Sequence, residues 1–482
     1  MYKSVTDVAQ SLISPFRDTM NEVMLTQYII AGLLLLGAVI GGYVLARLPL
    51  IRRLFIPTSL AAGILLLIFG PQVAGVHFPQ FQIPSEFYEM WKVLPKYMIT
   101  LVFAGLFLGK PLISIRDMWK LAGPQVAFGQ TIAWGQYVVA GLLTLLVLIP
   151  VFGMPAYVAS LLEISFEGGH GTVAGMTPVF NDLGFEDGRQ IATGLATASL
   201  LTALVTGVIL INWARRRGHI KTGGPIRVAR NKVYYHTIVA EVRRKGVSFR
   251  KVVTIRSLFL HIALLLFGVL IGWLIHQGLL LVEANTWGRG GEHKFFAYVP
   301  LFTFAMFGGM AAQFIWRKLG GTINREVVDL ISTLTLTLLI MAAIGTMSLE
   351  FLVKDAAVFG LLYGAGVVWI LFAFFFLARR MFRRYWFQNA IISYGQAMGM
   401  TATGLLFAQM VDPKNKTNAV EGFGYKQLMF EPLMGGGLVT ALSMPFIITL
   451  GLPTFVAICA GVMLFWAFIG LFIFGRGRRS KE

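Results

Sequence analysis

The stretch ISFEGGHGT, residues 164–172, lies inside an apolar segment that runs from about 154 to 185. It contains Gly168, Gly169 and Gly171, and three glycines in four residues destabilise any helix. Backbone that is not helical is tolerated at membrane depth only where protein or a water-filled cavity satisfies its polar groups. The sequence therefore predicts a re-entrant hairpin over 154–185, with its turn at this stretch.

A related stretch follows in the second half of the chain. Residues 392–400 read ISYGQAMGM, 228 residues after the first stretch, and at this offset Gly171 aligns with Gly399. The surrounding segment, 386–412, is again apolar and interrupted by glycine in the middle. We therefore expect a second re-entrant hairpin over 386–412.

The composition is that of an all-α integral membrane protein. Of the 482 residues, 56% are hydrophobic and 13% are charged, whereas about a quarter of the residues in globular proteins are charged. Mean hydropathy is +0.73, and no segment is polar enough to fold in water, which excludes a soluble enzyme. Apolar runs long enough to cross a bilayer predict about eleven transmembrane helices. They cover residues 27–49, 57–72, 96–109, 124–150, 188–213, 253–280, 297–318, 327–350, 356–381, 426–449 and 452–475.

The net charge of +19 comes from Lys and Arg in short clusters between the apolar spans. Such clusters are typical of cytoplasmic loops and give no reason to expect a nucleic-acid partner. With the N-terminus outside, most basic residues fall on the inside, Lys426 among them, and the C-terminus is cytoplasmic. We expect a multi-pass protein of the inner (plasma) membrane. The single cysteine, Cys459, excludes an intramolecular disulfide and a cysteine-based metal site.

The offset that relates the two hairpins also carries the first span onto the sixth. The charge pattern makes these two spans cross in opposite directions, which predicts two inverted repeats, and we expect the tips at Gly169 and Gly399 to meet near the membrane centre. The expected parts are an amphipathic lead-in (1–26), a first repeat (27–213), a basic cytoplasmic linker (214–252), a second repeat (253–450), and an extra transmembrane helix with a basic tail (451–482).

Inverted repeats with broken helices are a recurring architecture of secondary transporters. A broken helix frees N–H groups that hold a carboxylate and carbonyl groups that hold a cation. Glycine at the break lets the backbone approach a ligand closely. The pattern therefore indicates a carrier whose site lies at the two hairpins.

These residues resemble the bacterial sodium/glutamate symporter family over roughly residues 27 to 450. The resemblance implies an elevator-like, dimeric carrier that couples sodium to the import of an acidic amino acid, with both hairpins at the site. The matching stretches are Gly168–Thr172 (first re-entrant loop), Ile56–Gly63 (start of the second span), Leu334–Leu339 (eighth span) and Tyr394–Met410 (second hairpin, matching at Gly399, Ala402, Thr403 and Met410).

The chain departs from the family at several positions. Glu167 stands where the family's first loop usually begins with Ser, and the second loop is poorer in glycine and lacks the family's His. The acidic residue expected in the tenth span is absent, while Glu431 lies at the start of that span. An eleventh span, 452–475, exceeds the usual ten. These departures leave the substrate and the coupling ion open.

Glu167 is the strongest candidate for the site. An ionised carboxylate at membrane depth is costly and requires a cation, a partner or a proton. Glu167 is therefore a sodium ligand, a contact for a substrate ammonium, or a proton acceptor. Glu163, one helical turn earlier, either shares this role or pairs with a neighbour. His170 contacts a ligand or is satisfied by a carbonyl group within the loop.

Other candidates supply oxygen or amide groups at the two hairpins. Hydroxyl oxygens suit a hard cation such as sodium, although a Ser or Thr hydroxyl also bonds to its own helix. Gln396 binds a substrate carboxylate or bridges the hairpin arms. The candidate site comprises Glu167, Gly168, Gly169, His170, Gly171, Thr172, Ser393, Gln396, Gly399, Thr401 and Thr403, with Glu167, Thr172, Thr401 and Thr403 as sodium candidates.

Several catalytic motifs are absent from the sequence. The chain has no Gly-x-x-x-x-Gly-Lys, His-Glu-x-x-His or Gly-x-Ser-x-Gly motif, which argues against an ATP-driven pump, a metalloprotease and a serine hydrolase. We expect no enzyme and no cofactor other than sodium as coupling ion. The leading hypothesis is sodium-coupled import of glutamate or a related small organic anion. The alternative is a proton-coupled carrier or exporter, and a gated channel or membrane enzyme is more remote.

Overall fold

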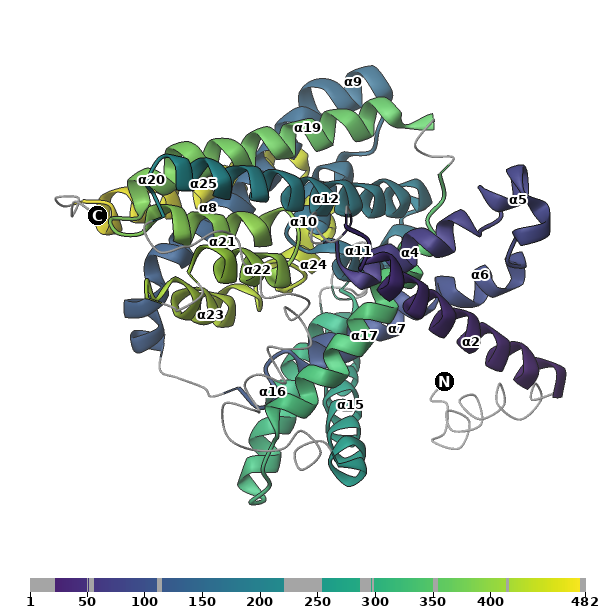
Figure 1. Ribbon diagram of the computed structural model, residues 1–482. Coiled ribbons are helices and arrows are strands. Elements are labelled where there is room, and N and C mark those ends of the chain that lie inside the picture. Colours follow the sequence, from purple (N-terminus) through teal and green to yellow (C-terminus); the bar gives the residue numbers. More distant parts are fainter. Residues whose placement is uncertain are drawn as a thin grey trace.

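The computed structural model describes residues 22–49, 51, 56–110, 115–220, 254–286, 296, 299–349, 354–412 and 416–476. These residues form helices and loops, with no β-strand among them (Figure 1). Seven of the helices are long and apolar enough to cross a membrane, which makes the chain a multi-pass membrane protein. They are Thr26–Leu45, Ala122–Phe152, Glu186–Arg216, Ile255–Asn285, Arg325–Gly345, Ala356–Met381 and Leu452–Phe474.

The expected lead-in and linker fall largely outside the described residues. Of the lead-in 1–26, only the residues from 22 onward are described, and they already belong to a helix that begins at Glu22. The linker 214–252 is described only as far as residue 220, and the basic tail only as far as residue 476.

The helices pack in two groups. Group one contains the first three expected spans of each half, and the helices from the two halves pack against one another. It comprises α2 (Glu22–Leu45), α4 (Thr58–Ile68), α5 (Ala74–His77), η1 (Pro79–Phe81), α6 (Ser85–Lys92), α7 (Leu94–Gly105), α15 (Ile255–Asn285), α16 (Leu301–Lys318) and α17 (Arg325–Gly345).

Group two contains the remaining helices of both halves. It comprises α8 (Ile115–Leu143) with η2 (Thr144–Leu148) and α9 (Ile149–Phe152), η3 (Ala156–Ser160), α10 (Leu161–Phe166), α11 (Gly169–Asp182), α12 (Glu186–Arg216), α19 (Ala356–Phe372) with η5 (Ala373–Leu377) and α20 (Ala378–Met381), α21 (Trp386–Ala397), α22 (Thr401–Val411), α23 (Ala419–Phe430), α24 (Leu438–Leu450), and α25 (Leu452–Phe468) with η6 (Ile469–Phe474). Helix α11 packs against α12 of its own group and against α7 and α17 of group one.

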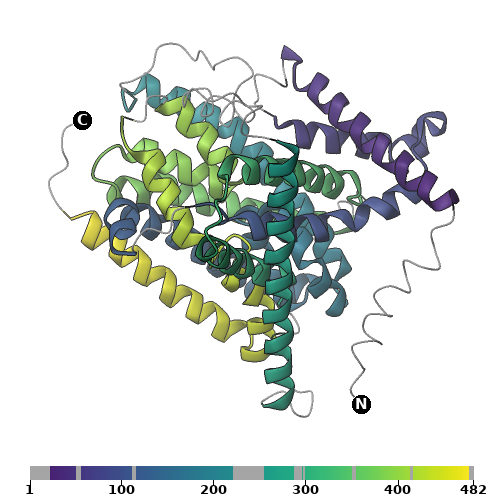
Figure 2. The ribbon, with the colours of Figure 1, turned by 90° about the horizontal axis from the view of Figure 1, so that it is seen from below.

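The outermost helices are the least buried. Helix α25, yellow in Figure 2, lies along the edge away from α2, in purple. Only 17% of the residues in the most apolar part of α2, and 22% in that of α25, are buried inside the protein, against 56% for α12. Their exposed apolar side chains are suited to contact with lipid.

Four of the eleven expected spans do not match a long apolar helix. Two of them are covered by shorter helices, α4 and α7, and a third by α16, which is long enough but less apolar. The expected uninterrupted span over 426–449 is wrong, because α23 ends at Phe430 and α24 begins only at Leu438. The interruption has a local cause: it contains Pro432 and a run of three glycines, and the backbone is left-handed at Gly435 (φ 68°) and at Gly436 (φ 103°).

Glycine permits close backbone contact where α16 packs against α15 and α7. A Cβ atom on Gly308 would lie 2.1 Å from the carbonyl oxygen of Gly268, and a Cβ atom on Gly309 would lie 2.0 Å from that of Ala104. Small residues at helix crossings let membrane helices associate through close packing. Group one therefore depends on these glycines for its tight centre.

We predict that Gly309→Ala destabilises the protein, because the added methyl group meets backbone atoms that cannot rotate away. Overpacking of this kind costs about 1–3 kcal/mol. The melting temperature of purified protein in detergent, followed by tryptophan fluorescence, should fall. Gly278→Ala on α15 is the control, since nothing lies within 4 Å of its Cβ position. Equal melting temperatures for the two variants would contradict the close contact.

Candidate functional site

The first chain break separates α10 from α11. Helix α10 ends at Phe166, and α11 begins at Gly169, whose backbone is left-handed (φ 68°). The N–H groups of Glu167 and Gly168 both donate to the carbonyl oxygen of Glu163, at 3.1 and 3.0 Å. This first turn lies where the glycine-rich stretch predicted it.

The second chain break lies between α21 and α22, which pack against each other as a helix–turn–helix pair. A Cβ atom on Gly404 would lie 2.6 Å from the carbonyl oxygen of Ile392, so the two arms touch along their backbones. At the tips, a Cβ atom on Gly169 would lie 3.2 Å from the carbonyl oxygen of Gly399. The structure therefore brings the first and second turns together.

The third chain break, residues 431–437 between α23 and α24, is fastened to the first by Glu163. The Glu163 side chain is fully buried. Its Oε1 accepts hydrogen bonds from the N–H of Gly435 and from the hydroxyl of Thr440, both at 2.9 Å. Its Oε2 accepts one from the hydroxyl of Tyr137 on α8, at 2.7 Å. Glu163 therefore pairs with neighbouring groups, which is one of the two roles that the sequence analysis left open for it.

Glu167 is buried differently. Its side chain is 5% exposed, and Oε2 has no hydrogen-bond partner among the described residues. The hydroxyl of Thr172 lies 3.0 Å from the carbonyl oxygen of Gly168 and 3.3 Å from that of Gly435. Glu167 and Thr172 therefore lie where the first turn meets the third, and the carboxylate of Glu167 is free to bind a cation or a proton.

The other predicted residues of the first hairpin have protein partners. His170 Nε2 lies 2.9 Å from the hydroxyl of Thr197 on α12. Gly168 fits closely, because a Cβ atom there would lie 2.5 Å from the carbonyl oxygen of Ile164. Gly171 lies within α11, and a Cβ atom on it would lie 2.7 Å from the side chain of Ile99 on α7. Gly171 is therefore a packing contact between the two groups.

The second hairpin contributes Ser393, Gln396, Thr401 and Thr403. Ser393 is 1% exposed and its hydroxyl has no partner among the described residues, while Thr403 is 4% exposed. The hydroxyl of Thr401 accepts a hydrogen bond from Gln427 at 2.8 Å and donates to Glu431 Oε1 at 3.3 Å. Gln396 accepts a hydrogen bond through its side-chain oxygen.

Three of the four sodium candidates fall into two sets, with Glu167 and Thr172 in one and Thr401 in the other. Thr172 contacts Gly435, near the end of the third turn, and Thr401 contacts Glu431, at its start. Within the described part of the chain, no hydrogen bond joins Glu167 or Thr172 to Thr401. The structure therefore places both sets at the third turn without merging them into one ligand cage.

The donor to Gln396 is Lys426, which the sequence analysis assigned to a cytoplasmic loop. That assignment is wrong, because Lys426 lies in α23 and its side chain is 0% exposed. Its ammonium nitrogen lies 3.6 Å from the centre of the Phe430 ring and 5.6 Å from that of Phe423. The surrounding sequence FGYKQLMF, residues 423–430, indicates this burial, because it places a single cation inside an apolar, aromatic run.

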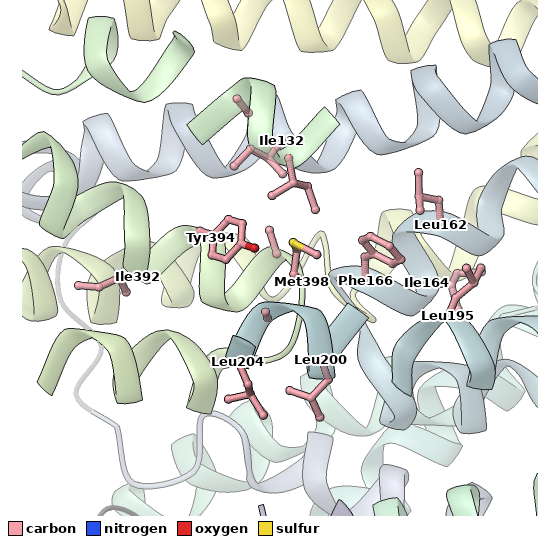
Figure 3. Packing of buried hydrophobic residues seen from close by; sticks show 14 of the residues in the cluster. Ile132, Leu162, Ile164, Phe166, Leu195, Leu200, Leu204, Ile392, Tyr394 and Met398 are labelled. Atoms are coloured by element: carbon pink, nitrogen blue, oxygen red, sulfur yellow. The ribbon is translucent and has the colours of Figure 1, made fainter. Parts of the chain in front are cut away.

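Large apolar side chains hold the tips in place. In Figure 3, Met398, at the end of α21, lies between Tyr394 and Phe166, with Leu200 of α12 and Ile132 of α8 on opposite sides. All five side chains are at most 1% exposed. The tips of the first and second turns are therefore enclosed by a close-packed apolar shell, where electrostatic interactions are strong.

This arrangement suits a small charged solute or an alkali cation better than a transition metal. Three interrupted segments offer backbone N–H and carbonyl groups. The nearby charged side chains are Glu163, Glu167, Glu431, Lys426 and Lys110, whose charge acts on Glu431. Within the described ranges, no three His, Cys, Asp or Glu side chains are grouped so that they could hold a metal ion.

Comparison with known proteins adds no further identification. No protein-family model matches the chain, and no curated protein matches it significantly.

We predict that Glu163→Leu destabilises the protein strongly, because it leaves the buried donors of Gly435, Thr440 and Tyr137 without an acceptor. Each unsatisfied buried donor costs roughly 1–3 kcal/mol. Glu167→Leu is the matched comparison, since it removes a buried carboxylate oxygen that has no partner. The melting temperature in detergent should fall for Glu163→Leu and stay equal or rise for Glu167→Leu. The opposite order would contradict the assigned roles.

We also predict that cysteines at 169 and 399 crosslink through a short thiol reagent in a Cys459→Ser background, because the two tips are in contact. Mass spectrometry of the digested protein should recover the joined peptides. A pair at 169 and 278, with the second position on α15, serves as control. Crosslinking no higher than that of the control pair would show that the two turns do not meet.

Proposed function

We propose that this chain is a secondary active transporter that imports glutamate or a related small organic anion together with sodium. The observation that carries the proposal is the meeting of three interrupted segments, at Gly169, Gly399 and Gly435, inside an apolar membrane protein. Broken backbone is expensive in such surroundings, and in carriers it is retained where it binds a substrate or an ion.

Features of both halves support an inverted repeat. Each half has a long helix that widens to a π-helix at a corresponding place, over Thr144–Leu148 and over Ala373–Leu377. Their separation is close to the offset that aligns Gly171 with Gly399. In group one, α4 packs on α2 and α17, and α16 packs on α15 and α7. If α2, α4 and α7 are exchanged with α15, α16 and α17, the contacts of α4 become the contacts of α16.

The division into two groups supports an elevator-like cycle. In this proposal group one is the stationary part, which holds a second copy in a homodimer, and group two carries the site across the inner membrane. The N-terminus is outside and the C-terminus is cytoplasmic. Helix α11 lies between the groups, so movement of group two changes the contacts of the helix that follows the first turn.

The charges near the turns favour uptake of a cation with the substrate. The three carboxylates of Glu163, Glu167 and Glu431 outnumber the two ammonium groups of Lys426 and Lys110, so an ionised site is negative before an anion enters. A co-transported sodium ion offsets this charge, and its entry contributes about 2.3 kcal/mol per 100 mV of membrane potential. Because the carboxylate of Glu167 has an unpartnered oxygen, a proton is the second candidate for the coupling ion.

Uptake by purified protein in liposomes tests the proposal. Acidic amino acids and dicarboxylates are offered in turn, with a sodium gradient or a proton gradient imposed separately. We expect the sodium gradient to drive accumulation of at least one of these anions. Accumulation driven only by the proton gradient would select the second candidate, and no uptake of any tested anion under either gradient would reject the proposed function.

We predict that Glu167→Gln changes the ion dependence of this uptake by at least tenfold in the half-maximal sodium or proton concentration, because it removes a charge at the first turn. Glu421→Gln, on the exposed side of α23, is the matched control and should behave like the parent protein. If Glu167→Gln keeps the sodium and pH dependence of the parent, Glu167 has no part in coupling.

A further inference from the structure

Lys426 occupies a space that a neighbouring helix leaves open for it. A Cβ atom on Gly129 of α8 would lie 2.5 Å from Lys426 Cε and 3.0 Å from Nζ. Any larger residue at position 129 would therefore collide with the end of the lysine side chain. A fully buried lysine is rare because removal of an ammonium from water costs several kcal/mol. Because α8, α21 and α23 separate this ammonium from water, groups of the protein must stabilise its charge instead.

The surroundings of this ammonium are those of a cation-binding position. Nζ donates to the side-chain oxygen of Gln396, in the last turn of α21, which ends at Ala397. The C-terminal end of a helix carries partial negative charge and favours a cation. The ring faces of Phe430 and Phe423 also attract a cation. The amide oxygen of Gln396 and the two aromatic rings therefore favour positive charge, and so offset the cost of burying the ammonium.

The ammonium is not neutralised by a direct ion pair. The charges of Glu167 and Glu431 both act on Lys426 electrostatically. Among the described residues, however, no carboxylate oxygen lies within 4.0 Å of Nζ. Lys426 therefore offsets the negative charges of Glu167 and Glu431 from a distance, as a bound ion would. It does so from a position behind the tip of the second hairpin.

We propose that Lys426 is a built-in cation that takes, at the C-terminal end of α21, the position of a bound coupling ion. In carriers with discontinuous helices, the C-terminal ends of half-helices coordinate sodium or a proton. Here the chain itself supplies that charge at the second turn, so an external cation enters only at the carboxylates of the first and third turns, Glu167 and Glu431, each of which has an oxygen unpartnered among the described residues. This inference rests on the proposed function and states which part of the site takes no external ion.

The test counts sodium ions bound to each chain of purified protein, by equilibrium binding of radioactive sodium. Lys426→Ala removes the ammonium and leaves a space lined by the oxygen of Gln396, so the count should rise by one. Lys426→Met removes the charge but fills the space, so the count should stay at the parent value. Lys354→Ala, at an exposed lysine, is the control. An unchanged count in Lys426→Ala would overturn the proposal.

A second pair of variants covers the case in which Lys426→Ala does not fold. Gly129→Ala displaces the end of the Lys426 side chain from its present position, and we expect at least a threefold change in the apparent sodium affinity of this variant. Gly424→Ala on α23 should not change it, because nothing lies within 4 Å of that Cβ position. Equal sodium affinity of both variants and the parent would overturn the proposal.

The same experiment separates this inference from the proposed function. A rise in bound sodium for Lys426→Ala, without uptake by the parent protein in liposomes, would retain the role of the ammonium and reject anion transport. Uptake by the parent protein with no extra sodium in Lys426→Ala would retain transport and reject the built-in cation.

Discussion

The site depends on one constraint: backbone that leaves the helix inside an apolar protein must find hydrogen-bond partners within the chain. Glu163 meets this requirement where two breaks adjoin. It accepts hydrogen bonds from Gly435 in the third turn, from Thr440 on α24 and from Tyr137 on α8. A single carboxylate thus joins α8 and α10 to the third turn and α24, which follow more than 270 residues later in the sequence, and so holds the first turn in place.

The two hairpin turns have opposite charge. The first turn presents Glu167, whose carboxylate has an unpartnered oxygen, and the second turn is approached from behind by the ammonium of Lys426. In the proposed inverted repeat, the two corresponding turns therefore differ in charge. In the proposed carrier, this difference leaves the first turn open to a cation and lets Lys426 fill the position at the second.

The two helix groups divide the work of the proposed carrier. Group one is tied together by close backbone contacts, such as that of Gly309 with Ala104, whereas group two contains all three breaks and the buried Glu163, Glu167 and Lys426. The groups touch where Gly171 on α11 packs against Ile99 on α7. They are also joined by a hydrogen bond from the N–H of Ser348, just after α17, to the side-chain oxygen of Gln190 on α12, at 3.0 Å.

The sequence by itself determined the class of fold and the position of the first two turns. Long apolar runs favour membrane helices, and the adjacent glycines at 168 and 169 favour a break in a helix, so both conclusions follow from local chemistry, although Gly171 lies within α11. Pro432 and the three glycines that follow it also indicate a break locally. The sequence analysis nevertheless expected an uninterrupted span there, because residues 426–449 are mostly apolar. Only the tertiary structure decided that Lys426 is buried, that Glu163 has three donors and that Glu167 and Glu431 each have an oxygen unpartnered within the described ranges. The partners of a charged side chain come from distant segments, so its role depends on packing that no local pattern records.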